Sequence, residues 1–202
     1  MKISTGGIIA ISIFGFIFVL VLIGVLTGVS TYNKLVSAEE SVNNSWANVQ
    51  NVYQRRTDLI PNLVNTVKGV ANFEKSTLTA VIEARAKATS VNINPKNLDE
   101  ASLQKFQSAQ DGVSSALSRL MVVVERYPEL KATQNFSELQ AQLEGTENRI
   151  TVERRNFNEA AQTYNTYLRR FPNNIFAGMF GFQKKAYFAA QKGAENAPKV
   201  EF

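Results

Sequence analysis

The stretch Arg55-Arg56-Thr57-Asp58-Leu59-Ile60-Pro61-Asn62-Leu63-Val64 lies at the centre of a helical pattern that runs from Ile8 to about Val91. Two apolar columns cross it at intervals of seven residues, which is the spacing of side chains on one packed helix face. The first column is Leu35, Val42, Val49, Arg56, Leu63 and Val70, and the second is Trp46, Tyr53, Ile60 and Val67. The pattern predicts one helix over 32–91, with other helices folded against it.

Arg56 places a charge in the first apolar column. Because a buried charge is costly unless it is paired, we expect Arg56 to lie in a buried ion pair, with Asp58 helping to satisfy an arginine or fixing the kink at Pro61. Pro61 has no N–H for the carbonyl of Thr57, which predicts a kink there. The other interpretation is a docking or switch site for a partner. The candidate site comprises Arg55, Arg56, Asp58, Pro61 and Asn62.

An uncharged apolar run, Ile8 to Val29, precedes this pattern. At about 1.5 Å per residue it is long enough to cross a hydrocarbon core of about 30 Å. It is too long for the apolar region of a signal peptide, which holds about 7–15 residues. The sequence predicts an uncleaved membrane span in contact with lipid, and domains at residues 1–31 and 32–202.

Few charges flank the span. Lys2 and the α-amino group precede it, and Lys34 is the only basic residue that follows before Arg55. Basic residues near a span favour the cytoplasmic side. By a margin of one charge, this predicts a cytoplasmic N-terminus and an extracytoplasmic domain.

Turn residues divide the rest of the chain. Asn92, Asn94 and Pro95 indicate a break at 89–97, and Asn97 with Glu100 three residues later fits a helix cap. Apolar periodicity predicts helices over 98–127 and 136–170. The aromatic segment 171–188 predicts a short helix or turns, and 193–202 an extended tail. The predicted fold is therefore all-α: one membrane helix, then an antiparallel up-and-down bundle of three long helices and a short aromatic-rich C-terminal helix.

Composition limits the chemistry. The chain of 202 residues has no Cys and no His, which excludes thiol catalysis, histidine acid–base catalysis and Cys or His zinc sites. The net charge is +5, but the basic residues are scattered, so no nucleic-acid partner is expected. Catalytic, cofactor and metal residues are predicted as none. An acidic metal cluster remains the alternative to a solvated face for Glu125, Glu129, Glu138, Glu144 and Glu147.

The sequence resembles the LemA family of bacterial membrane proteins. The motifs that carry the resemblance are Tyr32-Asn33-Lys34-Leu35-Val36, Trp46-Ala47-Asn48-Val49, the block Arg55 to Val64, Thr66-Val67-Lys68-Gly69, Glu83-Ala84-Arg85, Tyr164-Asn165, Arg170-Phe171-Pro172 and Pro198-Lys199-Val200-Glu201-Phe202. The resemblance implies a single N-terminal span, a four-helix up-and-down bundle and a bacterial cell membrane. It implies no enzyme activity, because the family has no established one.

Helix lengths suggest that part of the first helix has no partner in its own chain. The part of the first helix from Asn33 to Val91, 59 residues, is longer than the predicted second helix. The seam Val42, Trp46, Val49 and Tyr53 would then be exposed, and we expect a homo-oligomer through it. The alternative is that the first helix breaks, or that the aromatic tail folds back over the seam. That tail, Phe171 to Phe188, either caps the bundle or touches lipid.

These features favour a membrane-anchored, non-enzymatic scaffold or protein-interaction module that binds itself or a membrane-protein partner. An enzyme or metal-binding bundle that uses carboxylates and arginine is the alternative.

Overall fold

The computed structural model describes residues 5–70, 73–95 and 98–189. These residues form helices, turns and loops but no strand. The helices are α1 (Thr5–Lys68), α2 (Lys75–Ser90), α3 (Glu100–Val124), α4 (Pro128–Lys131), α5 (Gln134–Arg169) and α6 (Asn173–Met179). The predicted all-α class is confirmed. The expected extended tail over 193–202 lies outside the described residues.

The chain forms two compact units. Unit 1 combines Met1–Ser41 with Gln162–Lys184, and unit 2 combines Val42–Ala161 with Lys185–Phe202. Both α1 and α5 contribute to each unit. The predicted boundary between residues 31 and 32 stays a prediction.

Unit 1 contains the apolar run. Among the described residues, α1 is the one helix long and apolar enough to cross a membrane. Its large apolar side chains between Ile11 and Val29 are exposed, Phe14 to 75%. An apolar surface of this length, facing outward on every side of the helix, fits a single-pass membrane protein.

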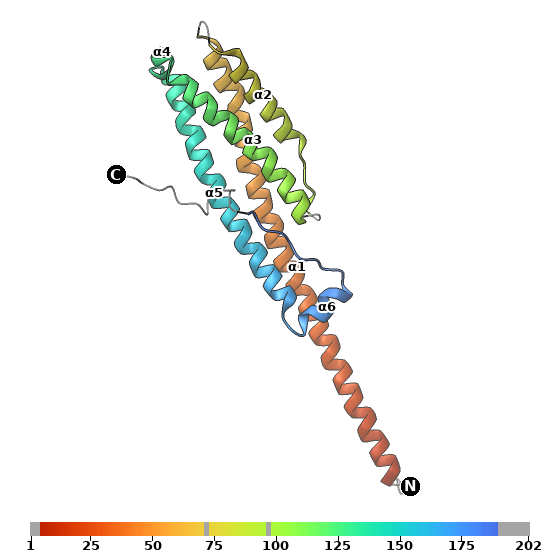
Figure 1. Cartoon of the computed structure of the whole chain (residues 1–202). Coiled ribbons are helices and arrows are strands. Elements are labelled where there is room, and N and C mark those ends of the chain that lie inside the picture. The colour runs from red at the N-terminus through yellow and green to blue at the C-terminus, as the bar shows by residue number, and fades with distance from the viewer. Residues whose placement is uncertain (1–4, 71–72, 96–97, 190–202) are drawn as a thin grey trace, which may run out of the picture. The chain divides into compact units, whose positions relative to one another are not determined.

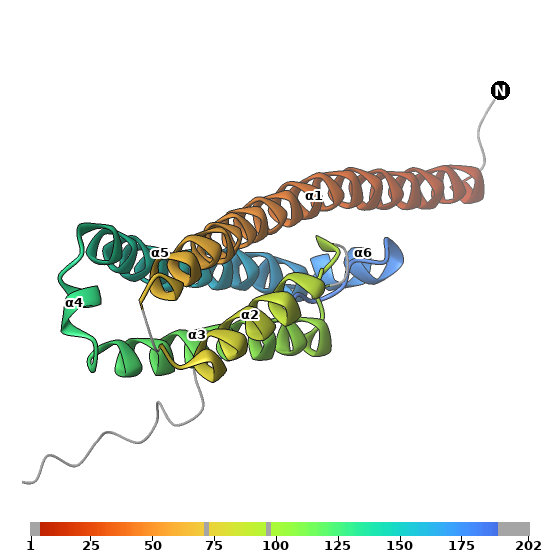
Figure 2. The ribbon, with the colours of Figure 1, turned by 90° about the horizontal axis from the view of Figure 1, so that it is seen from above.

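Unit 2 is a helical bundle. Figures 1 and 2 show α1, α2, α3 and α5 as neighbouring rods whose chain direction alternates. Its largely aliphatic core draws on five helices: Ile60, Leu63, Val64 and Val67 from α1; Leu78, Val81 and Ala88 from α2; Val113, Ala116, Leu120 and Val124 from α3; Leu130 from α4; Phe136 and Leu143 from α5. The heptad columns of the sequence thus face the core, with Leu63 and Val67 fully buried.

The prediction of one unbroken helix over 32–91 is wrong. Helix α1 ends at Lys68 and α2 begins at Lys75. Gly69 follows the end of α1, where a residue without a side chain readily stops a helix. Phe73, in the connection, is buried and its ring lies 5.0 Å from that of Tyr127. Burial of this aromatic ring favours a turn over continued helix, a tertiary effect that periodicity does not report.

Helix ends were predicted to within a few residues. The predicted helices 98–127 and 136–170 appear as α3 and α5, and the short α4 between them was not predicted. The cap predicted at Asn97 lies outside the described residues. Asp99 caps α3 instead, because its side chain accepts a 2.7 Å hydrogen bond from the Ser102 N–H, which also lowers the pKa of that carboxyl.

The seam Val42, Trp46, Val49 and Tyr53 is not exposed, so the basis for a homo-oligomer through it was wrong. The first three side chains are fully buried, and Tyr53 is 4% exposed. The ring of Trp46 lies 5.2 Å from Phe106 of α3, 5.7 Å from Phe157 of α5 and 6.1 Å from Phe188. Both alternatives therefore occurred: α1 breaks early, and the aromatic tail folds back.

Hydrogen bonds hold the returning tail in unit 2. The Asn158 side chain donates to the Phe188 carbonyl at 3.0 Å and accepts from the Phe188 N–H at 2.8 Å. Arg154 donates to the carbonyl of Ala189 at 2.9 Å, and its guanidinium lies over the Phe188 ring. The end of the aromatic segment thus caps the bundle.

Thiol labelling in this cysteine-free chain tests the covered seam. Val42→Cys and Val49→Cys are expected to react with a maleimide only after unfolding, because both side chains are fully buried. Asn51→Cys, at an exposed position of the same helix, is the matched control and is expected to react at once. Equal rates at Val49→Cys and Asn51→Cys would contradict the packing.

Candidate functional site

The centre of the site is the guanidinium of Arg56, which is 1% exposed. Helix α1 places it there because Arg56 shares a column with Val49 and Leu63, both fully buried. It forms a polar layer in unit 2 between the aromatic cluster around Trp46 and the aliphatic core that begins at Ile60.

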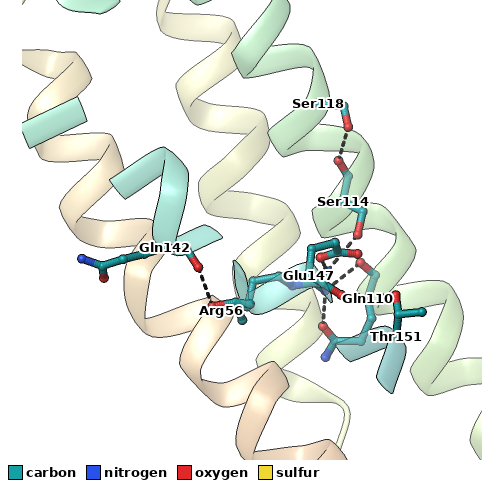
Figure 3. Close-up of polar contacts among 8 residues, drawn as sticks. Arg56, Gln110, Ser114, Ser118, Gln142, Glu147 and Thr151 are labelled. Carbon is teal, nitrogen blue, oxygen red and sulfur yellow. Dashed lines mark hydrogen bonds and ion pairs between the residues drawn. The ribbon is translucent and has the colours of Figure 1, made fainter. Parts of the chain in front are cut away.

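Four hydrogen bonds meet the guanidinium (Figure 3). Nη1 donates to Ser114 Oγ at 2.8 Å and to Glu147 Oε2 at 2.9 Å. Nη2 donates to the carbonyl of Gln110 at 3.0 Å and to its Oε1 at 2.7 Å. Through these bonds Arg56 links α1 to α3 and α5.

Charge balance at the site comes from Glu147. Its carboxylate forms the ion pair with Arg56, while its side chain is 47% exposed. Arg56 is therefore shielded from water while Glu147 stays partly hydrated. The desolvation cost of the pair is lower than that of a fully buried ion pair. The guanidinium carbon of Arg56 also lies 5.0 Å from the centre of the Tyr53 ring. Burial raises the pKa of the Tyr53 hydroxyl.

The prediction of a buried, paired Arg56 is confirmed, but the prediction that Asp58 helps to satisfy an arginine was wrong. Asp58 is exposed and accepts hydrogen bonds from Gln54. It lies two residues from Arg56 on the same helix, and residues at that spacing point to different faces. Glu147 was interpreted as part of a solvated face, since a partner so distant in sequence leaves no local signal.

Pro61 leaves a carbonyl of α1 without its helical hydrogen bond, as the sequence predicted, and α2 supplies the replacement donor, which the sequence did not indicate. Lacking an N–H, it leaves the carbonyl of Thr57 without its helical donor. Arg85 of α2 replaces that donor, because its Nε donates to the Thr57 carbonyl at 2.8 Å. Helix α1 continues past Pro61 to Lys68. The proline thus opens an acceptor on α1 that α2 uses.

The remaining motif residues lie at the surface. Arg55, Asp58 and Asn62 are exposed, and their spacing of three and four residues sets them along one strip of α1. Pro61, three residues after Asp58, is exposed as well. The structure therefore divides the candidate site into one buried residue and four exposed ones.

Two cavities flank the polar layer. One, of about 360 Å³, is lined by Arg56, Ser114, Leu117, Ser118, Met121, Gln140, Leu143, Glu144 and Glu147. The other, of about 290 Å³, is lined by Gln50, Tyr53, Gln54, Thr57, Ala88, Thr89, Val91, Asn92, Phe106 and Gln110. No group of three or more acidic side chains within reach of one metal ion occurs in the described part of the chain.

Removing the guanidinium of Arg56 tests how much it contributes to the free energy of unfolding. Arg56→Ala is expected to lower the free energy of unfolding by about 3 kcal/mol, near the lower end for breaking a buried pair, because water reaches Glu147. Arg155→Ala, whose side chain is 70% exposed, is the control and should cost less than about 0.5 kcal/mol. Thermal or urea unfolding of both variants measures this, and equal small losses would show that Arg56 is solvated.

A double-mutant cycle tests the link between Pro61 and Arg85. Arg85→Met is expected to cost about 1–3 kcal/mol in the parent chain, because a carbonyl loses its donor. In a Pro61→Ala background residue 61 supplies its own N–H, so the same change should cost less. Additive losses across the cycle would mean that Arg85 does not serve the acceptor that Pro61 opens.

Comparison with known proteins shows which sequences this chain is similar to. The LemA family model matches residues 45–202, which include the Arg55 to Val64 block and all partners of Arg56. The magnetosome protein MamQ 1 of Paramagnetospirillum magneticum is 27% identical over 186 residues, covering 84% of this chain and 68% of the relative. MamQ of Magnetospirillum gryphiswaldense is equally similar, and protein LemA of Metamycoplasma hominis is 24% identical over 79% of this chain. Since the family model covers well over half of the sequence, this chain belongs to the LemA family.

Proposed function

We propose that this protein is a membrane-anchored, non-enzymatic scaffold. The apolar part of α1 crosses the membrane once, and the bundle in unit 2 presents a surface for a protein partner. The bundle lies on the extracytoplasmic side, in keeping with the basic residues near the span.

An impermeant thiol reagent applied to intact cells that carry Asn51→Cys tests this orientation.

The proposal rests on the hydrogen bonds that Arg56 makes to other helices of the bundle. A buried arginine in a polar layer is the group that an anionic substrate would need. Here its two terminal nitrogens already donate to Ser114, Gln110 and Glu147. The cation therefore serves to hold three helices together, which is a structural use of charge.

The strip of Arg55, Asp58 and Asn62 is the surface that we assign to a partner. These residues belong to the same short block as Arg56, yet they face away from the core. Polar side chains of both charges suit a contact that forms and dissociates in water. Self-association remains part of the proposal only through exposed faces such as this one, since the seam around Trp46 is filled.

A ligand-binding or enzymatic function is the second candidate, favoured by the cavity of about 360 Å³ beside Arg56. Glu144 and Glu147 line it together with Ser114, so acidic and hydroxyl groups meet an apolar wall. Metal retained by the purified protein in elemental analysis, and lost in a Glu144→Gln, Glu147→Gln variant, would favour this candidate over the scaffold.

Site-specific photocrosslinking in cells tests the scaffold. A benzophenone amino acid at position 58 or 62 is expected to capture the same partner, because both positions lie on one strip. Position 155, exposed on α5, is the control and should not capture it. Capture that is equal at 58, 62 and 155, or absent at all three, would contradict the assigned surface.

A further inference from the structure

Helix α6 is held against the end of the apolar run of α1, within unit 1. Thr31 donates from its hydroxyl to Asn173 Oδ1 at 3.2 Å. The ring of Tyr32 lies 5.1 Å from that of Phe180 and 5.7 Å from that of Phe182. These contacts place α6 at the point where the span ends (Figure 1).

Gly28 allows this approach. A Cβ built at Gly28 would come within 3.0 Å of the Phe176 ring, closer than such atoms normally pack. The absence of a side chain there lets the aromatic ring rest on the backbone of α1. The contact is therefore built into the sequence of the span itself.

The outer side of the same segment is apolar and exposed. Phe171 is 81% exposed, Ile175 52%, Met179 73% and Phe180 45%. Ile175 and Met179 lie four residues apart on α6, so they share one side of that helix, and Phe171 lies just before its start. Large apolar side chains gathered in this way are unfavourable in water and usually mark a surface that is covered.

Basic residues accompany this apolar side. Arg169 and Arg170 at the end of α5 are exposed, as is Lys184 beyond α6. Apolar side chains flanked by arginine and lysine, next to the end of a span, have the composition of a segment that lies in the membrane interface. The segment itself packs on residues 28–32 of α1, where the apolar run ends.

We propose that segment 171–180 lies in the membrane interface as a collar beside the span. Its apolar side chains enter the boundary between headgroups and acyl chains, and Arg169, Arg170 and Lys184 contact lipid phosphates. The occupant of this surface is the bilayer rather than a protein. The proposal rests on the membrane span of the proposed function, and it adds a second lipid contact that fixes the end of α1 in depth.

Spin labelling of the full-length chain in vesicles of phosphatidylcholine with a minority of phosphatidylglycerol tests the collar. Single nitroxides at Phe171→Cys and Met179→Cys are expected to collide with oxygen more than with a water-soluble nickel complex, at a depth of about 5–10 Å. Val19→Cys in the span is the deep control. Val122→Cys, a 71% exposed apolar position of α3, is the aqueous control.

The outcomes separate the two proposals. If Val19→Cys reports water, the span itself is wrong and the proposed function fails. If Val19→Cys reports lipid while Met179→Cys and Phe171→Cys behave like Val122→Cys, the span stands and the collar is overturned. Immobile labels that neither reagent reaches would mean that a protein covers the segment, which also overturns it.

Discussion

A guanidinium kept from water must find acceptors in the protein, and at Arg56 these come from two helices distant in sequence. Ser114 and Gln110 lie on α3 and Glu147 on α5. One position in the bundle satisfies all of these bonds together, so the group sets the register of three helices. Apolar contacts on either side tolerate sliding far better, since they are not directional.

The same short block also ties in the fourth long helix. Pro61 frees the carbonyl of Thr57, and Arg85 of α2 donates to it. Within six residues, α1 therefore carries a donor for α3 and α5 and an acceptor for α2. The aromatic cluster around Trp46 and the aliphatic core from Ile60 onward pack on either side of this polar layer.

The aromatic C-terminal segment divides between two tasks. Phe188 is buried against Trp46 and Phe157 in unit 2, where Asn158 holds its backbone. The earlier residues, from Phe171 to Phe180, pack on the end of the apolar run and leave large apolar side chains exposed. The sequence presented capping and lipid contact as alternatives for one segment. Capping falls to its end around Phe188, and lipid contact is what we propose for Phe171 to Phe180.

The sequence by itself determined the helical class, the apolar run, the core-facing columns and the burial of Arg56. Each depends on local spacing or on the cost of exposing or burying a side chain, which can be read along one helix. The break after Lys68, the partners of Arg56 and the covering of Trp46 depended on the tertiary structure. Phe73 meets Tyr127, Arg56 meets Glu147 and Trp46 meets Phe188 across long stretches of chain. Contacts of that kind leave no periodic trace, because their energy arises only when helices distant in sequence pack together.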